Sequence, residues 1–304
     1  MFYLIHGLFF QSEFPLSLPE AQNSQNIDVN VENKTIDPKV FDHDPAFSED
    51  VYYKIIDTQN IFLSIPKIAK FHIKNGNNIS IDAYDNLAKS WPAIELYLFG
   101  SIIGVILVQR DLFALHSNAI LINNKGVLIA GDSGAGKSTT AAIFQQKGYK
   151  VLCDDIVVIN NDLCINGEFP KIKLWDDALK KLNINESGLT PVATQLGKFH
   201  YPLTQNNKFS ASQFEISAIY ILSTSDSITE IKTENIKGFN RYGMLLSNTY
   251  RNELVLGLNK QEKHLDLCSL LAEKVSITAI QRPKNIFSGF DIVNKIIHDV
   301  EAKT

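Results

Sequence analysis

Apolar and polar positions divide the chain into a strand-rich beginning and a mixed remainder. In the first part, short alternating runs such as Phe71–Asn75 are followed by Gly and Asn residues, a pattern typical of β-hairpins. From Ala119 onward, short apolar runs alternate with longer helix-forming stretches, as in α/β proteins. We therefore predict an α/β protein, with a small β-rich N-terminal subdomain over residues 1–90 and a domain with a mixed β-sheet over residues 91–304.

The same patterns predict individual elements in the second domain. We expect strands at 119–122, 127–130, 149–153, 216–222 and 275–280, and helices at 139–147, 174–182, 241–250, 261–274 and 285–302. The apolar run 96–108 is shorter than a bilayer requires, and we interpret it as a buried helix. The apolar start, Met1–Phe10, lacks the basic residues of a signal peptide, and we interpret it as a strand.

One glycine-rich stretch carries a strong chemical signal. Gly131-Asp-Ser-Gly-Ala-Gly-Lys-Ser138 has the spacing G-x-x-x-x-G-K-[ST], and it lies between a predicted strand and a predicted helix. This spacing lets successive backbone N–H groups surround a phosphate at the N-terminus of the helix. Lys137 is expected to reach the β- and γ-phosphates, and the Ser138 hydroxyl to bind Mg²⁺. The predicted phosphate-binding residues are Gly131, Asp132, Ser133, Gly134, Ala135, Gly136, Lys137, Ser138 and Thr139.

A histidine is expected beside this loop. The tetrapeptide Asn123–Gly126 predicts a hairpin in which Ile122 lies opposite Val127. Extending that register places His116 opposite Ser133, next to the bound phosphates. The alternative is a structural histidine at a strand start.

Two adjacent carboxylates follow the next predicted strand. Asp154 and Asp155 stand between two apolar runs, where an unpaired charge would be costly. In open α/β sheets ligands bind beyond the carboxyl ends of strands, so both carboxylates are expected near the phosphates. Neighbouring residues of an extended segment point to opposite faces, which predicts two separate roles. One carboxylate would face the nucleophile or γ-phosphate, and the other would orient, bind metal-bound water or cap. The alternative is that both are solvated turn residues.

Together, His116, the loop 131–138 and the pair Asp154–Asp155 resemble the HPr kinase/phosphorylase family, whose P-loop domain is related to phosphoenolpyruvate carboxykinase. The resemblance covers about half of the chain, with weaker similarity at Lys173–Trp175 and Arg282–Pro283. The N-terminal region is more similar to the relatives that phosphorylate lasso-peptide precursors. Val157 and Val158 stand where members with phosphorylase activity tend to carry an acidic residue, which favours the kinase direction.

This resemblance implies an ATP-dependent kinase with Mg²⁺, or alternatively Mn²⁺, as its metal. The acceptor would be a serine or threonine hydroxyl of a peptide or small protein, such as a ribosomal precursor peptide. The expected catalytic residues are Asp155 as general base, Asp154, His116 and Lys137, and the expected metal ligands are Ser138 and Asp154. A small-molecule hydroxyl kinase and a non-catalytic module that senses nucleotide or binds peptide remain alternatives.

Three further cations are weaker candidates. Arg251 and Arg282 have the charge to contact a transferring phosphoryl group or the substrate, although surface arginines are common. Lys198 lies in the polar stretch Ser187–Ser212, a candidate substrate loop.

Composition excludes several classes of partner. The formal net charge of −4 argues against a nucleic-acid ligand, which requires a basic face. Three scattered cysteines, Cys153, Cys164 and Cys268, form neither a disulfide framework nor a zinc-ligand pattern. We expect a cytoplasmic protein without a membrane or nucleic-acid partner, and a homo-oligomer remains an open alternative.

Overall fold

The computed structural model describes residues 1–22, 26–41, 51–167, 171–192, 197–202 and 212–303. The chain forms two compact units. The first comprises Met1–Leu112 together with Glu253–His264, and the second comprises Phe113–Asn252 together with Leu265–Thr304.

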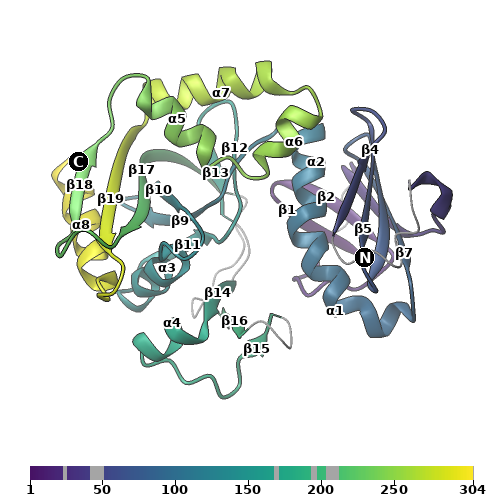
Figure 1. Ribbon diagram of the computed structural model, residues 1–304, viewed down its shortest axis with the longest axis horizontal. Helices are drawn as coiled ribbons and strands as arrows, with labels where there is room; N and C mark the ends of the chain where they lie inside the picture. Colours follow the sequence, from purple (N-terminus) through teal and green to yellow (C-terminus); the bar gives the residue numbers. More distant parts are fainter. Residues whose placement is uncertain (23–25, 42–50, 168–170, 193–196, 203–211, 304) are drawn as a thin grey trace. The chain divides into compact units, whose positions relative to one another are not determined.

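The first unit is built on a seven-stranded sheet (Figure 1). Its strand order is β1-β2-β3-β7-β6-β5-β4, and β3 runs parallel to both of its neighbours. The strands are β1 Phe2–Ile5, β2 Leu8–Ser12, β3 Val29–Asn33, β4 Tyr52–Ile55, β5 Asn60–Ile65, β6 Ala69–Lys74 and β7 Asn78–Ala83, followed by helices α1 Leu87–Tyr97, η3 Leu98–Ile102, α2 Ile103–Gln109 and, later in the chain, α6 Asn252–Gly257. A short 3₁₀ helix, η1, spans Pro38–Val40. The predicted β-rich N-terminal region is confirmed.

The apolar helical run is longer than predicted and belongs to the first unit. Leu87–Gln109 is the one helix, within the described residues, that is long and apolar enough to cross a membrane by length and composition. Of its most apolar window, 56% is buried, as in a core helix. Ser17 donates to Glu95 over 2.6 Å, and Arg110 pairs with Asp28 at 2.8 Å. These contacts join the helical run and the residue after it to the residues between β2 and β3. The units divide after Leu112 and not at the predicted boundary after residue 90.

The second unit contains the sheet that carries the predicted chemistry. Its strand order is β11-β9-β10-β17-β13-β12-β8, and β19 pairs with both β17 and β18. The strands are β8 Phe113–Leu115, β9 Ser117–Ile122, β10 Lys125–Gly131, β11 Lys150–Cys153, β12 Val157–Ile159, β13 Cys164–Asn166, β17 Gln213–Ser225, β18 Lys232–Asn235 and β19 Ser276–Pro283. A separate three-stranded sheet has the order β14-β16-β15, from β14 Lys171–Trp175, β15 Thr190–Pro191 and β16 Lys198–Pro202.

Alternation along the central strand assigns one face of the sheet to each of two cores. Val127 and Ile129 of β10 join a cluster with the helices α3 and α8. Leu128 and Ala130 join a second cluster with α5 and α7 (Figure 1). The helices of the second unit are α3 Lys137–Gln146, α4 Asp176–Lys181, α5 Asn240–Ser247, α7 Gln261–Lys274, which begins in the first unit, and α8 Gly289–Ala302.

Strand directions bring the predicted site to one edge of this sheet. β10, β17 and β19 run parallel, and β9 is antiparallel to both β10 and β11, so β11 runs the same way as β10. The carboxyl ends of these strands therefore meet at one edge. The glycine-rich loop, the pair Asp154–Asp155 and Arg282 all lie at that edge.

Several local predictions are wrong. The start predicted as one strand forms the two strands β1 and β2, and the helix predicted from residue 285 begins at Gly289. The hairpin turns on Asn123 and Asn124 alone, with φ of 49° and 60°, so Ile122 pairs with Lys125 and not with Val127. Asparagine tolerates left-handed backbone well enough to make this tight turn. The helix expected from residue 174 begins at Asp176, because β14 continues through Trp175.

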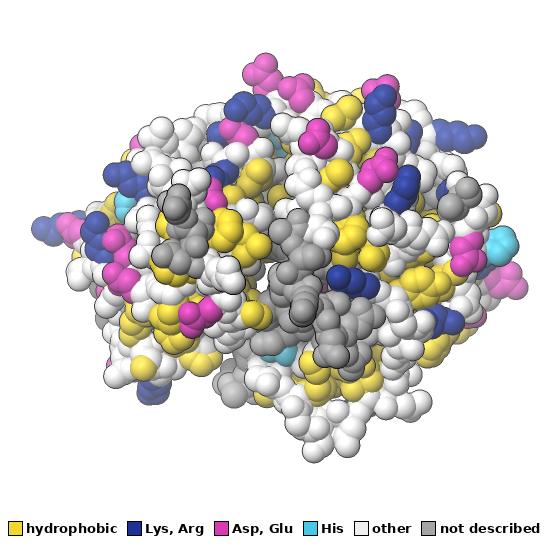
Figure 2. All heavy atoms as spheres, turned by 180° about the vertical axis from the view of Figure 1, so that it is seen from behind, with side chains coloured by type: hydrophobic (Ala, Val, Ile, Leu, Met, Phe, Trp, Pro, Cys, Tyr) yellow, Lys and Arg dark blue, Asp and Glu magenta, His cyan; other side chains and the backbone are white. Residues whose placement is uncertain are grey.

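Charges of both signs are interspersed on the face shown in Figure 2. That mixture of signs on this face agrees with the small net charge of the chain.

Candidate functional site

The glycine-rich loop joins the end of β10 to the start of α3. Gly131 has a φ of 131°, and a Cβ atom there would lie 2.1 Å from the carbonyl oxygen of Leu222 on β17. Gly136 precedes the helix with a φ of 110°. Glycine is thus required both for close strand approach and for the turn into the helix. The loop has the strand–loop–helix setting that its spacing predicts.

Lys137 and Arg282 both donate to carbonyl groups of the loop. Nζ of Lys137 lies 2.6 Å from the oxygen of Gly131 and 3.1 Å from that of Asp132. Nε of Arg282 donates to Ala135 over 2.9 Å, and Nη2 donates to Gly134 over 3.2 Å. Arg282 therefore supports the loop from its carbonyl side, although sequence reasoning offered it as a phosphate contact.

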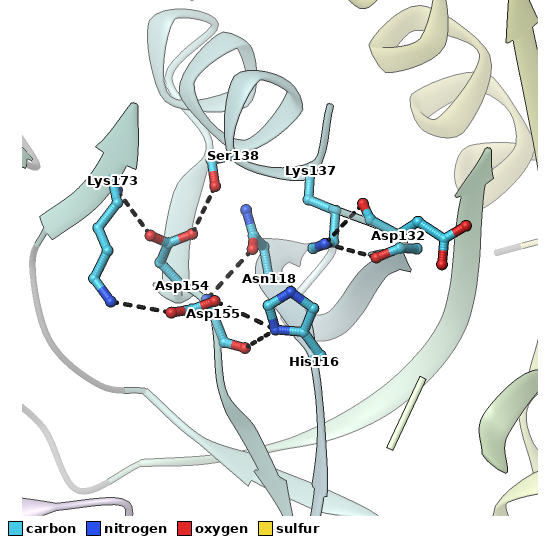
Figure 3. Close-up of polar contacts among 9 residues, drawn as sticks. His116, Asn118, Asp132, Lys137, Ser138, Asp154, Asp155 and Lys173 are labelled. Atoms are coloured by element: carbon cyan, nitrogen blue, oxygen red, sulfur yellow. Dashed lines mark hydrogen bonds and ion pairs between the residues drawn. The ribbon is translucent and has the colours of Figure 1, made fainter. Parts of the chain in front are cut away.

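Asp154 links the loop helix to β14. The hydroxyl of Ser138 donates to Oδ1 of Asp154 over 3.3 Å, and the backbone N–H of Lys173 donates to Oδ2 over 2.8 Å (Figure 3). The structure thus places the two residues predicted as metal ligands, Ser138 and Asp154, within hydrogen-bond distance of each other.

Asp155 has different partners. Its Oδ2 lies 3.0 Å from Nζ of Lys173, and its Oδ1 lies 3.3 Å from Nδ1 of His116 (Figure 3). Nδ1 of His116 also lies 3.0 Å from the carbonyl oxygen of Asp155. Since both of these oxygens are acceptors, Nδ1 carries the proton and Nε2 is left as an acceptor.

Strand alternation does not cause this separation of the two aspartates. Asp155 has a φ of 77°, in the left-handed region, so the segment is not extended there as the sequence argument assumed. The backbone turn, held by the two contacts to His116, is what directs the carboxylates to different partners.

The protonation tendencies of the two carboxylates also differ. Burial and then the neighbouring charge of Asp155 raise the pKa of Asp154. Burial also acts to raise the pKa of Asp155, but Lys173 and then His116 outweigh it and lower this pKa. Burial and then Lys137 lower the pKa of His116. At neutral pH, Asp155 is therefore ionised and His116 is neutral.

Asn118 adds a donor that the sequence did not predict. The residue is fully buried on β9, and its Oδ1 accepts a long hydrogen bond, 3.5 Å, from the backbone N–H of Asp155. Within the part of the chain that the structure describes, its Nδ2 has no hydrogen-bond partner. An unsatisfied buried amide is costly and calls for an explanation. In Figure 3 this amide lies between the side chains of Asp154 and Lys137.

These groups border a cavity of ≈ 660 Å³ at the sheet edge, within the second unit. His116, Asp155 and Lys198 line it, and so do Arg282 and the loop from Ser133 to Thr139. Arg251 is not among the described residues of the lining; its guanidinium lies 5.7 Å from the ring centroid of Tyr250. Parts of the candidate substrate loop, 193–196 and 203–211, lie outside the described residues.

The donor atoms fit a magnesium ion that shares its shell with phosphate. Ser138 and Asp154 offer a hydroxyl and a carboxylate oxygen within 3.3 Å of each other. In the described part of the chain, no cluster of three or more His, Cys, Asp or Glu side chains could form a complete metal site. Mg²⁺ commonly takes one or two protein ligands and completes its shell with phosphates and water. Ser138 and Asp154 would be its protein ligands here.

Lys173 is the other site residue without an assigned role in the sequence argument. The sequence analysis named it only as part of the weakly similar tripeptide Lys173–Trp175. In the structure its backbone N–H contacts Asp154 and its side chain contacts Asp155. The available signal was a lysine between buried Ile172 and Leu174 in a short strand. A charge in such a setting needs an opposite charge nearby.

Part of the chain is similar in sequence to known proteins. No protein-family model matches the chain. It is 43% identical over 54 residues to an HPr kinase/phosphorylase of Treponema pallidum (strain Nichols), covering 18% of this chain and 16% of that protein. It is 40% identical over 68 residues to an HPr kinase/phosphorylase of Pediococcus pentosaceus, covering 22% and 21%, and 36% identical over 87 residues to one of Limosilactobacillus reuteri, covering 28% and 25%. Over these segments the chain is similar to HPr kinase/phosphorylases.

The matched segments span a quarter or less of each of these relatives. Among solved structures, the HPr(Ser) kinase/phosphatase of Coxiella burnetii aligns with 62% of this chain and 89% of its own, at 18% identity and a TM-score of 0.31. That score is too low to support a fold assignment, which rests here on the strand order and the glycine-rich loop.

Proposed function

We propose that this chain is an ATP-dependent kinase that transfers the γ-phosphate to a serine or threonine hydroxyl of a peptide or small protein. The observation that carries the proposal is the position of the ionised Asp155 carboxylate, which lines the same cavity as the glycine-rich loop. Phosphoryl transfer needs a held triphosphate and a group that positions or deprotonates the acceptor.

Each group at the sheet edge has a part in that reaction. The N–H groups of the loop and Lys137 bind the triphosphate. Asp155 accepts the hydroxyl proton as the new O–P bond forms, while the bond from the γ-phosphorus to the bridging oxygen breaks and ADP leaves. His116 and Lys173 orient Asp155 through the contacts described above. Mg²⁺, when bound, supplies charge neutralisation at the phosphate oxygens.

Asn118 completes the arrangement. Its Nδ2, which has no partner among the described residues, belongs to a residue of the cavity lining. We assign it as a donor to an oxygen of the transferring phosphoryl group. Fixed donors aimed at developing charge lower the barrier because they need no reorganisation.

The acceptor class rests on the similarity to HPr kinase/phosphorylases and stays a proposal, as does a ribosomal precursor peptide as the acceptor. We place the activity in the cytoplasm, in the kinase direction, without nucleic-acid or membrane partners; assembly of several copies remains open.

The test is incubation of the purified chain with labelled ATP, Mg²⁺ and two acceptors, HPr protein and short serine-containing peptides encoded beside the gene. Transfer of label to a serine or threonine supports the proposal. Transfer only to small hydroxyl compounds would point to a small-molecule kinase. Nucleotide binding without any transfer would point to a non-catalytic module.

A further inference from the structure

The cavity at the sheet edge has two chemically different ends. One end carries His116, Asp155 and Lys173, which lie near the amino end of β9, after β11 and on β14. The other end carries the segment that follows β19, where Ile286 and Phe287 line the cavity with 52% and 39% of their surfaces exposed. Exposed apolar side chains inside a polar cavity suit a ligand that has an apolar part.

Sheet order places the phosphate loop between these ends. β10, which carries the loop, has β9 and β11 on one side and β17 and β19 on the other. A triphosphate held by the loop with its γ-phosphate toward Asp155 therefore extends its opposite end toward the segment after β19. The opposite end of a nucleoside triphosphate is the nucleoside.

From this we infer that Phe287, with Ile286, forms the binding site for the base of the nucleotide donor. The inference rests on the proposed function, since it needs the γ-phosphate to face Asp155. It adds a site outside the glycine-rich loop and explains apolar side chains that phosphate binding leaves unused.

The ring of Phe287 contacts two other side chains. It packs edge-on against Phe290, with centroids 5.9 Å apart and an interplanar angle of 89°. The ammonium of Lys181 lies 5.9 Å from the Phe287 centroid, and Lys181 is itself paired with Asp177 at 2.9 Å. A ring that already contacts neighbouring side chains loses less entropy than a free one when a base stacks on it.

Polar groups accompany the ring. Lys284 and Asn285 precede Ile286 in the same segment and also line the cavity. An ammonium and an amide beside an aromatic ring can bind the ribose hydroxyls or the base edge. The ligand class is therefore a nucleoside, joined to the phosphates that the loop holds.

The test separates the base from the phosphates. Binding of Mg²⁺–ATP and of inorganic Mg²⁺–tripolyphosphate is measured by calorimetry for the full chain and for Phe287→Ala, Phe287→Tyr and Phe239→Ala. Phe239 is a matched control because its ring is 83% exposed and lies outside the cavity lining.

Phe287→Ala is expected to weaken ATP binding roughly 5- to 100-fold, the usual effect of removing one base-stacking ring. Tripolyphosphate binding should stay within about twofold, since that ligand has no base. Phe287→Tyr keeps a ring and should bind ATP like the wild type, as should Phe239→Ala.

Unchanged ATP binding in Phe287→Ala, or equal weakening of both ligands, would overturn the base site and leave the kinase proposal standing. A wild-type chain that binds neither ligand would overturn both proposals.

Discussion

The hydroxyl of Ser138 donates to Oδ1 of Asp154 across 3.3 Å, which joins the first turn of α3 to the end of β11. The residues are 16 positions apart in the chain. Both oxygens belong to the types that Mg²⁺ prefers, and both lie at the sheet edge where the phosphates are proposed to bind. The contact predicts how each variant of this pair behaves.

Asp154→Asn should raise the Mg²⁺ concentration needed for half-maximal phosphoryl transfer, because an amide oxygen binds the cation more weakly than a carboxylate does. Transfer rates across a Mg²⁺ titration, with wild type beside the variant, give the measurement. Removal of the metal with EDTA should abolish transfer by both proteins. Full activity in excess EDTA would rule out the metal site.

Asp155→Asn keeps the shape of the side chain and removes the proton acceptor. Single-turnover transfer should fall by roughly 10²- to 10⁴-fold, while ATP binding changes little. The exchange of roles between the two aspartates would show as the reverse pattern, with weaker Mg²⁺–ATP binding and an intact chemical step.

Asn118→Leu removes the assigned donor, together with the long hydrogen bond, 3.5 Å, that Oδ1 accepts from the backbone N–H of Asp155. Transfer should fall by roughly 10- to 10³-fold, as when one fixed donor to developing charge is lost. The free energy of unfolding should change by no more than about 1 kcal/mol, because the variant removes one long hydrogen bond together with an Nδ2 group that has no partner among the described residues. Urea unfolding and single-turnover transfer are measured together. A loss of stability parallel to the loss of rate would mark Asn118 as structural.

Gly131→Ala should destabilise the second unit by roughly 3 kcal/mol or more, because the backbone φ is unfavourable and strand β17 must move. The added Cβ would meet the carbonyl oxygen of Leu222 at 2.1 Å. Gly134→Ala is the control: its φ of 80° is also positive, but no atom of the described residues lies within 4 Å of the added carbon. That variant should lose only about 1–2 kcal/mol. Equal losses in urea unfolding would show that strand approach is unimportant.

A charge cluster of the first unit predicts a pH dependence. Asp111 lies 2.7 Å from Nζ of Lys260 and 2.7 Å from Nζ of Lys263. Burial acts to raise the pKa of Asp111, but the two lysines outweigh it and lower this pKa. A lowered folded-state pKa stabilises the protein above the unfolded pKa, and this stability is lost as the pH falls through the folded value.

Asp111→Asn should therefore reduce the stability of the first unit by up to about 1 kcal/mol at neutral pH, with the difference fading below about pH 4. Asparagine also accepts the positive φ of 57° at this position, so the backbone is matched. Trp91 fluorescence reports unfolding of this unit in a Trp175→Phe background, since its indole N–H donates to Pro15 over 3.0 Å. A difference that persists at low pH would exclude the ion pairs as its cause.

The spacing of residues along the chain was enough to locate the glycine-rich loop, which we propose binds phosphate. Its residues are consecutive, and the groups that bind phosphate are their own backbone N–H groups, so Gly131–Ser138 specified the site before any packing was known. Local sequence also located the strand β11, which ends at Cys153 just before Asp154, because an apolar run followed by charged residues marks a buried strand end. The β-rich beginning was also readable, since alternation with turn residues is a local property.

Only the tertiary structure decided which distant groups meet at this edge. Lys173 reaches Asp155 because the strand β14 passes beside the end of β11. Arg282 supports the loop because β19, which carries it, runs parallel to β17. The carbonyl that Arg282 contacts belongs to Ala135, 147 residues earlier in the chain. Such contacts depend on strand order and register, and hydrophobic patterning within one segment does not encode its partner in another. The sequence thus determined the glycine-rich loop that we propose binds phosphate, and long-range packing determined which side chains surround it.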